Sequence, residues 1–118
     1  MTTMYVRVGG GPAIKQVVDQ LYTWILSDEQ LSPYFEHVTV ESLKRHMAAL
    51  LAQVLGGPAE YGGRDLGAAH ASLDITPEHY TRVVDLALAS LFLAHAPREV
   101  VAAVEETLDA VQPQIVAA

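Results

Sequence analysis

The sequence predicts an all-α protein, because apolar residues recur every three or four positions, which is the spacing of one helix face. Residues that start and stop helices punctuate these stretches. Alternating patterns typical of strands are weak, and there is no internal repeat or long linker. A length of 118 residues suits one compact domain, so we expect a single domain over residues 1–118.

The first long helix is expected to begin at Pro12 and to run to about Leu26. A short element at residues 4–8 precedes it, and the Gly9-Gly10-Gly11 run ends that element because glycine tolerates turn dihedrals. The apolar face of the long helix consists of Ile14, Val17, Val18, Leu21 and Ile25. Tyr22 lies on the same face.

Ser32-Pro33 breaks the chain, Tyr34-Phe35 follows, and a second long helix is expected to open at Thr39 or Glu41. Its apolar stripe consists of Leu43, Met47, Leu50, Leu51 and Val54. Gly56-Gly57-Pro58 ends it. Residues 57–69 are glycine-rich and irregular, and a loop of that length in a compact domain is usually functional or mobile.

Thr76-Pro77-Glu78 is a strong helix start, since it combines a capping hydroxyl, a proline and an acid in the first turn. The buried face of this helix is expected to be Tyr80, Val83, Val84, Ala87, Leu88 and Leu91. Pro97 restarts the chain, and the last helix is expected to end at Pro113. The expected architecture is therefore two short early helices, a loop and two longer late helices.

Composition limits the function classes. Hydrophobic residues make up 51% of the chain and charged residues 18%, which supports a core and argues against disorder. The net charge of −7 makes nucleic acid and an anionic membrane surface poor partners. The absence of cysteine excludes disulfides, thiolate metal sites and thioether attachment. No secretory signal or membrane span is visible, so we expect a cytoplasmic protein.

Several short motifs follow one another in a fixed order along residues 5–116. They are the early glycine run, Leu21-Tyr22, Pro33-Tyr34-Phe35, Leu55-Gly56-Gly57-Pro58, Tyr61, Gly63-Arg64, His70 and Ile75-Thr76. Each motif alone is weak, but their order and spacing resemble the truncated haemoglobins of the first group. The resemblance implies a truncated globin fold, in which a two-over-two helical sandwich surrounds haem b (iron protoporphyrin IX).

The resemblance identifies His70 as the proximal ligand of the haem iron, a role suited to a neutral imidazole. Position alone would favour an ordinary core or loop histidine. Tyr22 resembles the distal tyrosine, whose hydroxyl donates a hydrogen bond to dioxygen. In a dry pocket such a bond slows ligand escape by ~1–2 kcal/mol, or roughly tenfold. Without the resemblance, Tyr22 would be an ordinary half-buried tyrosine.

Other haem contacts are implied in the same way, with simple core packing as the alternative. They are Phe35, Leu43, Met47, Leu51, Ile75, Tyr80 and Val83. Met47 stands where many relatives have glutamine, and its thioether cannot donate a hydrogen bond. Leu21 and Leu51 stand where relatives often have phenylalanine, which implies a roomier pocket. Lys44, Arg45 and Arg64 are candidates for pairing with the haem propionates.

His46 has two interpretations. In some cyanobacterial and algal relatives the matching histidine binds the iron on the sixth side when no ligand is present. The alternative is a surface histidine, or one near a propionate. His37, His79 and His95 have no convincing partner in the sequence. No histidine follows His95, so covalent attachment of haem through the last helix is not expected.

The resemblance implies reversible binding of dioxygen, carbon monoxide and nitric oxide at ferrous iron, and nitric oxide dioxygenation as an activity. That reaction combines dioxygen with nitric oxide to give nitrate and ferric haem. A separate reductase would then be required, because the chain has no flavin or nicotinamide motif. Two alternatives remain open: a two-histidine haem protein using His70 and His46 for electron transfer or redox sensing, and a haem-free globin-like interaction module.

Overall fold

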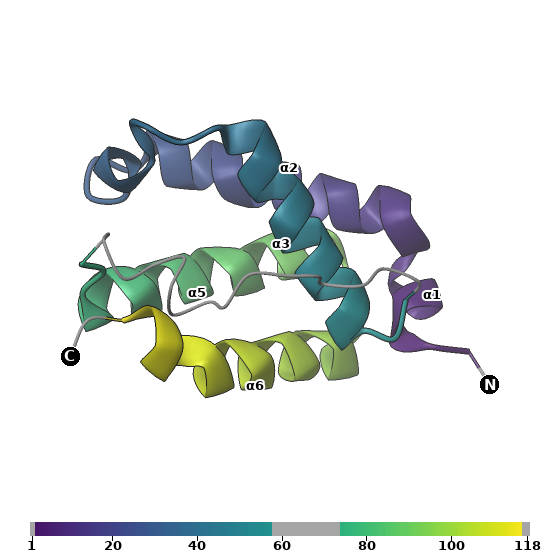
Figure 1. The fold of residues 1–118 in the computed structure, drawn as a ribbon. Coiled ribbons are helices and arrows are strands. Elements are labelled where there is room, and N and C mark those ends of the chain that lie inside the picture. The colour runs from purple at the N-terminus through teal and green to yellow at the C-terminus, as the bar shows by residue number, and fades with distance from the viewer. Residues whose placement is uncertain (1, 58–73, 117–118) are drawn as a thin grey trace.

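The computed structural model describes residues 2–57 and 74–116, and every regular element in these residues is helical (Figure 1). The elements are α1 (Met4–Val8), α2 (Gly10–Ser27), the 3-10 helix η1 (Ser32–Phe35), α3 (Val40–Val54), α5 (Pro77–Leu93) and α6 (Arg98–Ile115). The all-α prediction is confirmed for this part of the chain.

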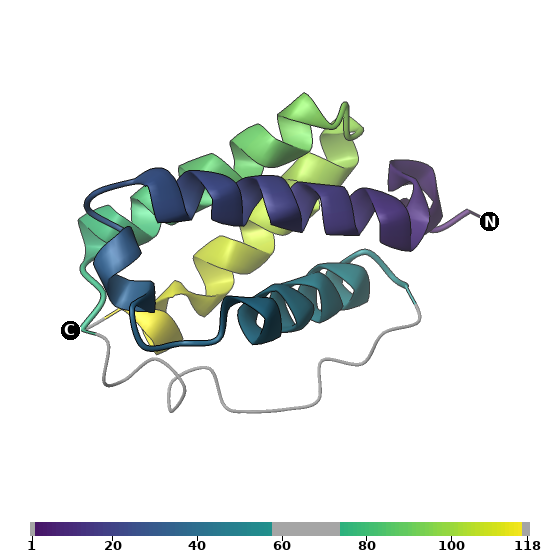
Figure 2. The same cartoon turned by 90° about the horizontal axis from the view of Figure 1, so that it is seen from above.

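The four long helices form two pairs that cross each other. In Figure 1, α5 and α6 run side by side in opposite directions, and α3 crosses in front of α2. Helix α2 contacts α3 and α5, while α6 contacts α5 and α3, so each pair packs on the other. The view from above shows α3 lying beside α2 (Figure 2). The core between the pairs includes Val18, Leu21, Ile25, Leu31, Val100 and Val104, all at most 2% exposed.

Helix α2 presents the apolar face that the sequence predicts. Its buried residues are Ile14, Val17, Val18, Leu21, Tyr22 and Ile25. The helix begins at Gly10 rather than Pro12, because the turn that ends α1 is made by Gly9 and by Gly10, which has φ 71° and is already the first helical residue. Gly9 has φ 114°, in the left-handed region, where other residues are strained.

The N-terminal helix is fastened to the end of α3. The backbone N–H of Tyr5 donates to the carbonyl of Leu55 at 2.9 Å. Gly56 turns the chain with φ 82°, and a Cβ at Gly57 would clash with the Tyr5 ring. The predicted glycine stop is therefore confirmed, and its second glycine leaves room for an aromatic ring from α1.

Helix α5 begins at Pro77 as predicted, with the Thr76 hydroxyl accepting from the His79 N–H at 3.1 Å. The predicted end of the last helix was wrong, because α6 continues through Pro113 to Ile115. A proline this close to the C-terminus removes one helical hydrogen bond, and the chain still closes the next turn, from the Val116 N–H to the Gln112 carbonyl.

The expected contrast between short early helices and longer late helices was also wrong. Helices α2 and α3 have 18 and 15 residues, and α5 and α6 have 17 and 18. The sequence underestimated α2 because Gly10 and Gly11 at its start carry no apolar pattern. Among the described residues, no helix is both long and apolar enough to cross a membrane.

Candidate functional site

Tyr22 is the buried polar group that points most directly to a binding site. It lies in the last third of α2 and is 5% exposed. Burial raises the pKa of its phenol to about 12, so the group stays protonated and remains a hydrogen-bond donor. Among residues 2–57 and 74–116 the structure shows no hydrogen bond between this hydroxyl and another described residue, although no fully buried side-chain N or O atom of these residues lacks a partner. A buried donor without a protein partner is suited to a ligand.

The ring of Tyr22 is held from one side by Phe35. The two ring centroids are 6.1 Å apart and the planes stand at 88°, an edge-to-face contact. Phe35 closes the short helix η1 and is itself only half-buried. The structure therefore brings these two predicted site residues together, and Phe35 keeps free surface beside the tyrosine.

The inner face of α3 supplies an apolar wall. Leu43 and Met47 are half-buried and pack against the core, whereas Leu51 is 6% exposed and belongs to the core itself. The spacing of four residues places all three on one side of the helix. Leu43 and Met47 therefore keep apolar surface for a further contact, and Leu51 supports them from behind.

The start of α5 adds further apolar side chains. Ile75 and Val83 are half-buried and pack against the core. Tyr80 is 6% exposed, and its hydroxyl donates to the Leu108 carbonyl of α6 at 2.6 Å. Its hydroxyl is thus used within the protein, and a contact between its ring and haem stays a prediction.

The basic residues predicted near the propionates lie in different settings. Lys44 is 3.3 Å from Asp19 of α2 and 3.9 Å from Glu41. Asp19 also pairs with Lys15 at 2.7 Å, and this hydrogen bond, with a smaller one from Lys44, lowers the pKa of the Asp19 carboxyl. Arg45 is exposed. Pairing with propionates stays a prediction for these residues.

The two predicted iron ligands differ in what the structure says of them. His70 lies outside the described residues, as do Arg64 and Tyr61. His46 is on α3, directly before Met47, and its side chain is exposed although it has an interaction within the protein. Neither predicted role for His46 is therefore decided by its position.

One contact close to the predicted site residues escaped the sequence. The Tyr34 hydroxyl lies 2.6 Å from Nδ1 of His79, with the rings at 78° and their centroids 5.4 Å apart. The expectation that His79 has no partner was wrong, because the fold brings η1 against the first turn of α5. The sequence contains only a weak signal of this contact, namely the polar aromatic residue Tyr34 after Pro33 and the histidine His79 after the Thr76 cap.

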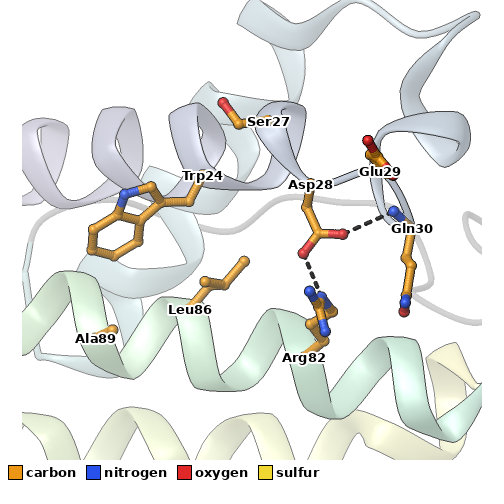
Figure 3. Close-up of a pocket in the computed structure, with 8 residues that line it drawn as sticks. All are labelled: Trp24, Ser27, Asp28, Glu29, Gln30, Arg82, Leu86 and Ala89. Atoms are coloured by element: carbon orange, nitrogen blue, oxygen red, sulfur yellow. Dashed lines mark hydrogen bonds and ion pairs between the residues drawn. The ribbon is translucent and has the colours of Figure 1, made fainter.

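A hollow of about 620 Å³ lies elsewhere, where the end of α2 meets α5 (Figure 3). It is lined by Trp24, Ser27, Asp28, Glu29, Gln30, Arg82, Leu86 and Ala89. Asp28 and Arg82 form an ion pair across it, and this pair lowers the pKa of the Asp28 carboxyl. None of the predicted site residues lines it, so it is separate from the site around Tyr22.

Comparison with known proteins places the chain in a family. The bacterial-like globin family matches residues 3–112. A group 1 truncated haemoglobin of Nostoc commune is 40% identical over 83 residues, which cover 70% of each chain. One from Mycolicibacterium paratuberculosis is 32% identical over 113 residues, covering 96% of this chain and 83% of that one.

The chain belongs to the group 1 truncated haemoglobins. The solved truncated haemoglobin of Tetrahymena pyriformis, in its Fe(III) form, has the same fold, with a TM-score of 0.89. The match covers 99% of this chain and all of that one, at 21% identity. The two crossed pairs α2–α3 and α5–α6 are accordingly the two-over-two sandwich of this family.

The cofactor of this truncated haemoglobin is haem b, and the described residues fit it. A flat, largely apolar macrocycle needs apolar walls with surface to spare, and Phe35, Leu43 and Met47 are half-buried aromatic or apolar side chains. A ligand on its iron needs a polar group in a dry environment, and the Tyr22 hydroxyl is one.

Proposed function

We propose that this truncated haemoglobin binds dioxygen and related diatomic gases reversibly, with Tyr22 as the distal hydrogen-bond donor. The observation that carries the proposal is Tyr22, whose side chain is buried and protonated and whose hydroxyl has no hydrogen bond to another described residue. When bound, haem would supply a ferrous iron able to take one diatomic molecule.

The proximal side is assigned to His70, the resemblance-based ligand that lies outside the described residues. A neutral imidazole is the usual proximal group of globins. It leaves the opposite face of the haem to the side chains of α2 and α3. Tyr22 and Met47 both belong to these helices, and we propose that they form the distal pocket.

The distal pocket has one donor in place of the two that a tyrosine–glutamine pair would provide. Tyr22 donates through its phenol, whereas Met47 offers only a thioether that cannot donate. Leu43 contributes no polar atom. We propose that a diatomic ligand is therefore held by a single hydrogen bond, which makes its escape depend on the orientation of one side chain.

A nitric oxide dioxygenase activity is the finer part of this proposal. The same pocket would admit nitric oxide, which would react with the bound dioxygen to give nitrate and leave the iron ferric. A separate reductase must then restore the ferrous state, because the described residues all belong to the globin fold. We propose a cytoplasmic location for this cycle.

The test is a reaction of the haem-loaded protein with gases, followed by visible absorption. Ferrous protein equilibrated with dioxygen should return to its starting spectrum when the gas is removed. Addition of one equivalent of nitric oxide in the presence of dioxygen should give ferric protein and one nitrate per haem. The Tyr22→Phe variant should release dioxygen roughly tenfold faster.

Other outcomes would contradict specific parts of the proposal. Oxidation to ferric protein without a reversible stage would exclude reversible binding. Reversible binding without nitrate would remove the dioxygenase activity alone. Failure to take up haem would favour the haem-free interaction module.

A further inference from the structure

The hydrogen bond between Tyr34 and His79 joins two elements that are far apart in the sequence. It links η1 to the first turn of α5 across 45 residues, at 2.6 Å and in a partly buried setting. His79 is fixed at a second point, because its backbone N–H donates to the Thr76 hydroxyl. His79 is thus held through both its backbone N–H and its imidazole ring, so the position of its ring on α5 is fixed.

The short helix η1 carries adjacent aromatic residues with different partners. Tyr34 reaches His79 on α5, whereas Phe35 reaches the Tyr22 ring on α2. A 3-10 helix turns by about 120° per residue, so neighbouring side chains leave it in different directions. The rotation of η1 about its axis therefore sets both contacts together.

At its start η1 is fixed by the backbone, since the Ser32 N–H donates to the Asp28 carbonyl at 2.9 Å. Helix η1 has only four residues and no side-chain cap. Leu31, directly before it, is fully buried and fixes one end. At the other end the next residues, Glu36 and His37, are exposed. Among the described residues, the contact between Tyr34 and His79 is the one side-chain hydrogen bond of η1, and it acts next to Phe35.

From this arrangement we propose that Tyr34 and His79 are positioning residues for the distal hydrogen bond. They fix η1 so that Phe35 holds the Tyr22 ring edge-on, and the Tyr22 hydroxyl then keeps one direction in the pocket. The inference rests on the proposed distal role of Tyr22. Neither Tyr34 nor His79 needs to touch the ligand.

A second link between the same parts of the chain provides the matched control. Asp28, just after α2, pairs with Arg82, which lies one turn beyond His79 on α5. This pair is more exposed, with Arg82 at 50% of its side-chain surface. The pair lies on the hollow of Figure 3, and its member Asp28 is seven residues before Phe35. We expect the pair to add to stability without orienting the Tyr22 ring.

The experiment uses haem-loaded protein and two readouts of the distal hydrogen bond. The first is the C–O stretching frequency of the ferrous protein with carbon monoxide, which a nearby O–H dipole lowers. The second is the rate of dioxygen release. The variants are Tyr22→Phe, Tyr34→Phe, His79→Leu, His79→Asn and Arg82→Gln, with circular dichroism to verify that each one folds.

We expect Tyr34→Phe and His79→Leu each to raise the C–O frequency in the direction of Tyr22→Phe and to speed dioxygen release at least threefold. The double variant should add little to either single one, because both break the same hydrogen bond. His79→Asn should recover most of the wild-type signal, since its amide places an acceptor near the former Nδ1. Arg82→Gln should leave both readouts unchanged.

The outcomes separate this inference from the proposed function. If Tyr22→Phe changes both readouts while Tyr34→Phe and His79→Leu change neither, the positioning role is wrong and the distal role of Tyr22 stands. An equal response in Arg82→Gln would also overturn it, because general loosening of the fold would then be the cause. No response in Tyr22→Phe itself would refute the distal role and the inference with it.

Discussion

The hydroxyl of Tyr80 donates a 2.6 Å hydrogen bond to the carbonyl of Leu108 and so fastens α5 to α6. Tyr22 is at least as deeply buried, yet its hydroxyl has no such hydrogen bond to another described residue. Two buried phenols of one protein thus have opposite uses. One contributes to the fold, and we propose that the other serves a ligand.

This contrast predicts opposite effects for the same substitution. Tyr80→Phe should lower the free energy of unfolding by about 1 kcal/mol, because one buried hydrogen bond is lost. Tyr22→Phe should leave stability nearly unchanged, since no protein hydrogen bond is removed. Thermal unfolding of the haem-loaded variants, together with dioxygen release rates, measures both effects. Fast release in Tyr80→Phe with normal release in Tyr22→Phe would reverse the assignment.

The alkaline titration of Tyr22 is a second prediction. Burial raises its pKa from an ordinary value near 10 to about 12 in the folded protein. Between these values the unfolded chain ionises while the folded chain does not. The stabilising contribution is therefore complete below pH 10 and is lost as the pH rises toward 12.

Tyrosinate absorbance follows this titration directly. The Tyr22→Phe variant should have the same absorbance change as wild type below about pH 11, because Tyr22 does not ionise there. Tyr80→Phe is the matched variant, since burial also raises the pKa of Tyr80 to about 12. A smaller change in Tyr22→Phe near pH 10 would mean that Tyr22 is accessible to water.

Two leucines near the end of α5 are predicted to contribute very differently to stability. Leu91 is 2% exposed and lies in the core, whereas Leu93 is 60% exposed. Leu91→Ala should cost about 3 kcal/mol through lost burial and a cavity. Leu93→Ala should change stability by less than about 0.5 kcal/mol. Comparable melting temperatures for the two variants would contradict the described packing of α5.

The coordination of the ferrous iron is a fourth prediction. The proposed distal donor is Tyr22 on α2, so we expect the sixth position to be open and the ligand-free ferrous spectrum to have one broad band. The His46→Ala variant should then look like wild type. Split sharp bands in wild type that disappear in His46→Ala would instead support iron binding by His46, and with it the electron-transfer alternative.

The helices and their buried faces could be predicted from the sequence because each face repeats at helical spacing. The six buried residues of α2 include all five that the pattern selects. Helix ends were less predictable. Pro113 lies inside α6, since a proline close to a C-terminus removes little hydrogen bonding.

The site was predictable only in part. Tyr22 and Phe35 were predicted as site residues from an ordered set of motifs, and the structure brings their rings together. The pairing of Tyr34 with His79 could not be predicted, because it depends on how η1 packs against α5, and no local pattern encodes a contact over 45 residues. The role of His70 stays a prediction.

The decisive measurement is the ferrous ligand-free absorption spectrum of His70→Gly beside wild type, with and without added imidazole. We expect wild type to hold one haem per chain with a five-coordinate spectrum. His70→Gly should lose this spectrum, and free imidazole should restore it by filling the axial position. An unchanged spectrum in His70→Gly without imidazole would show that another residue holds the iron and that the proximal assignment is wrong.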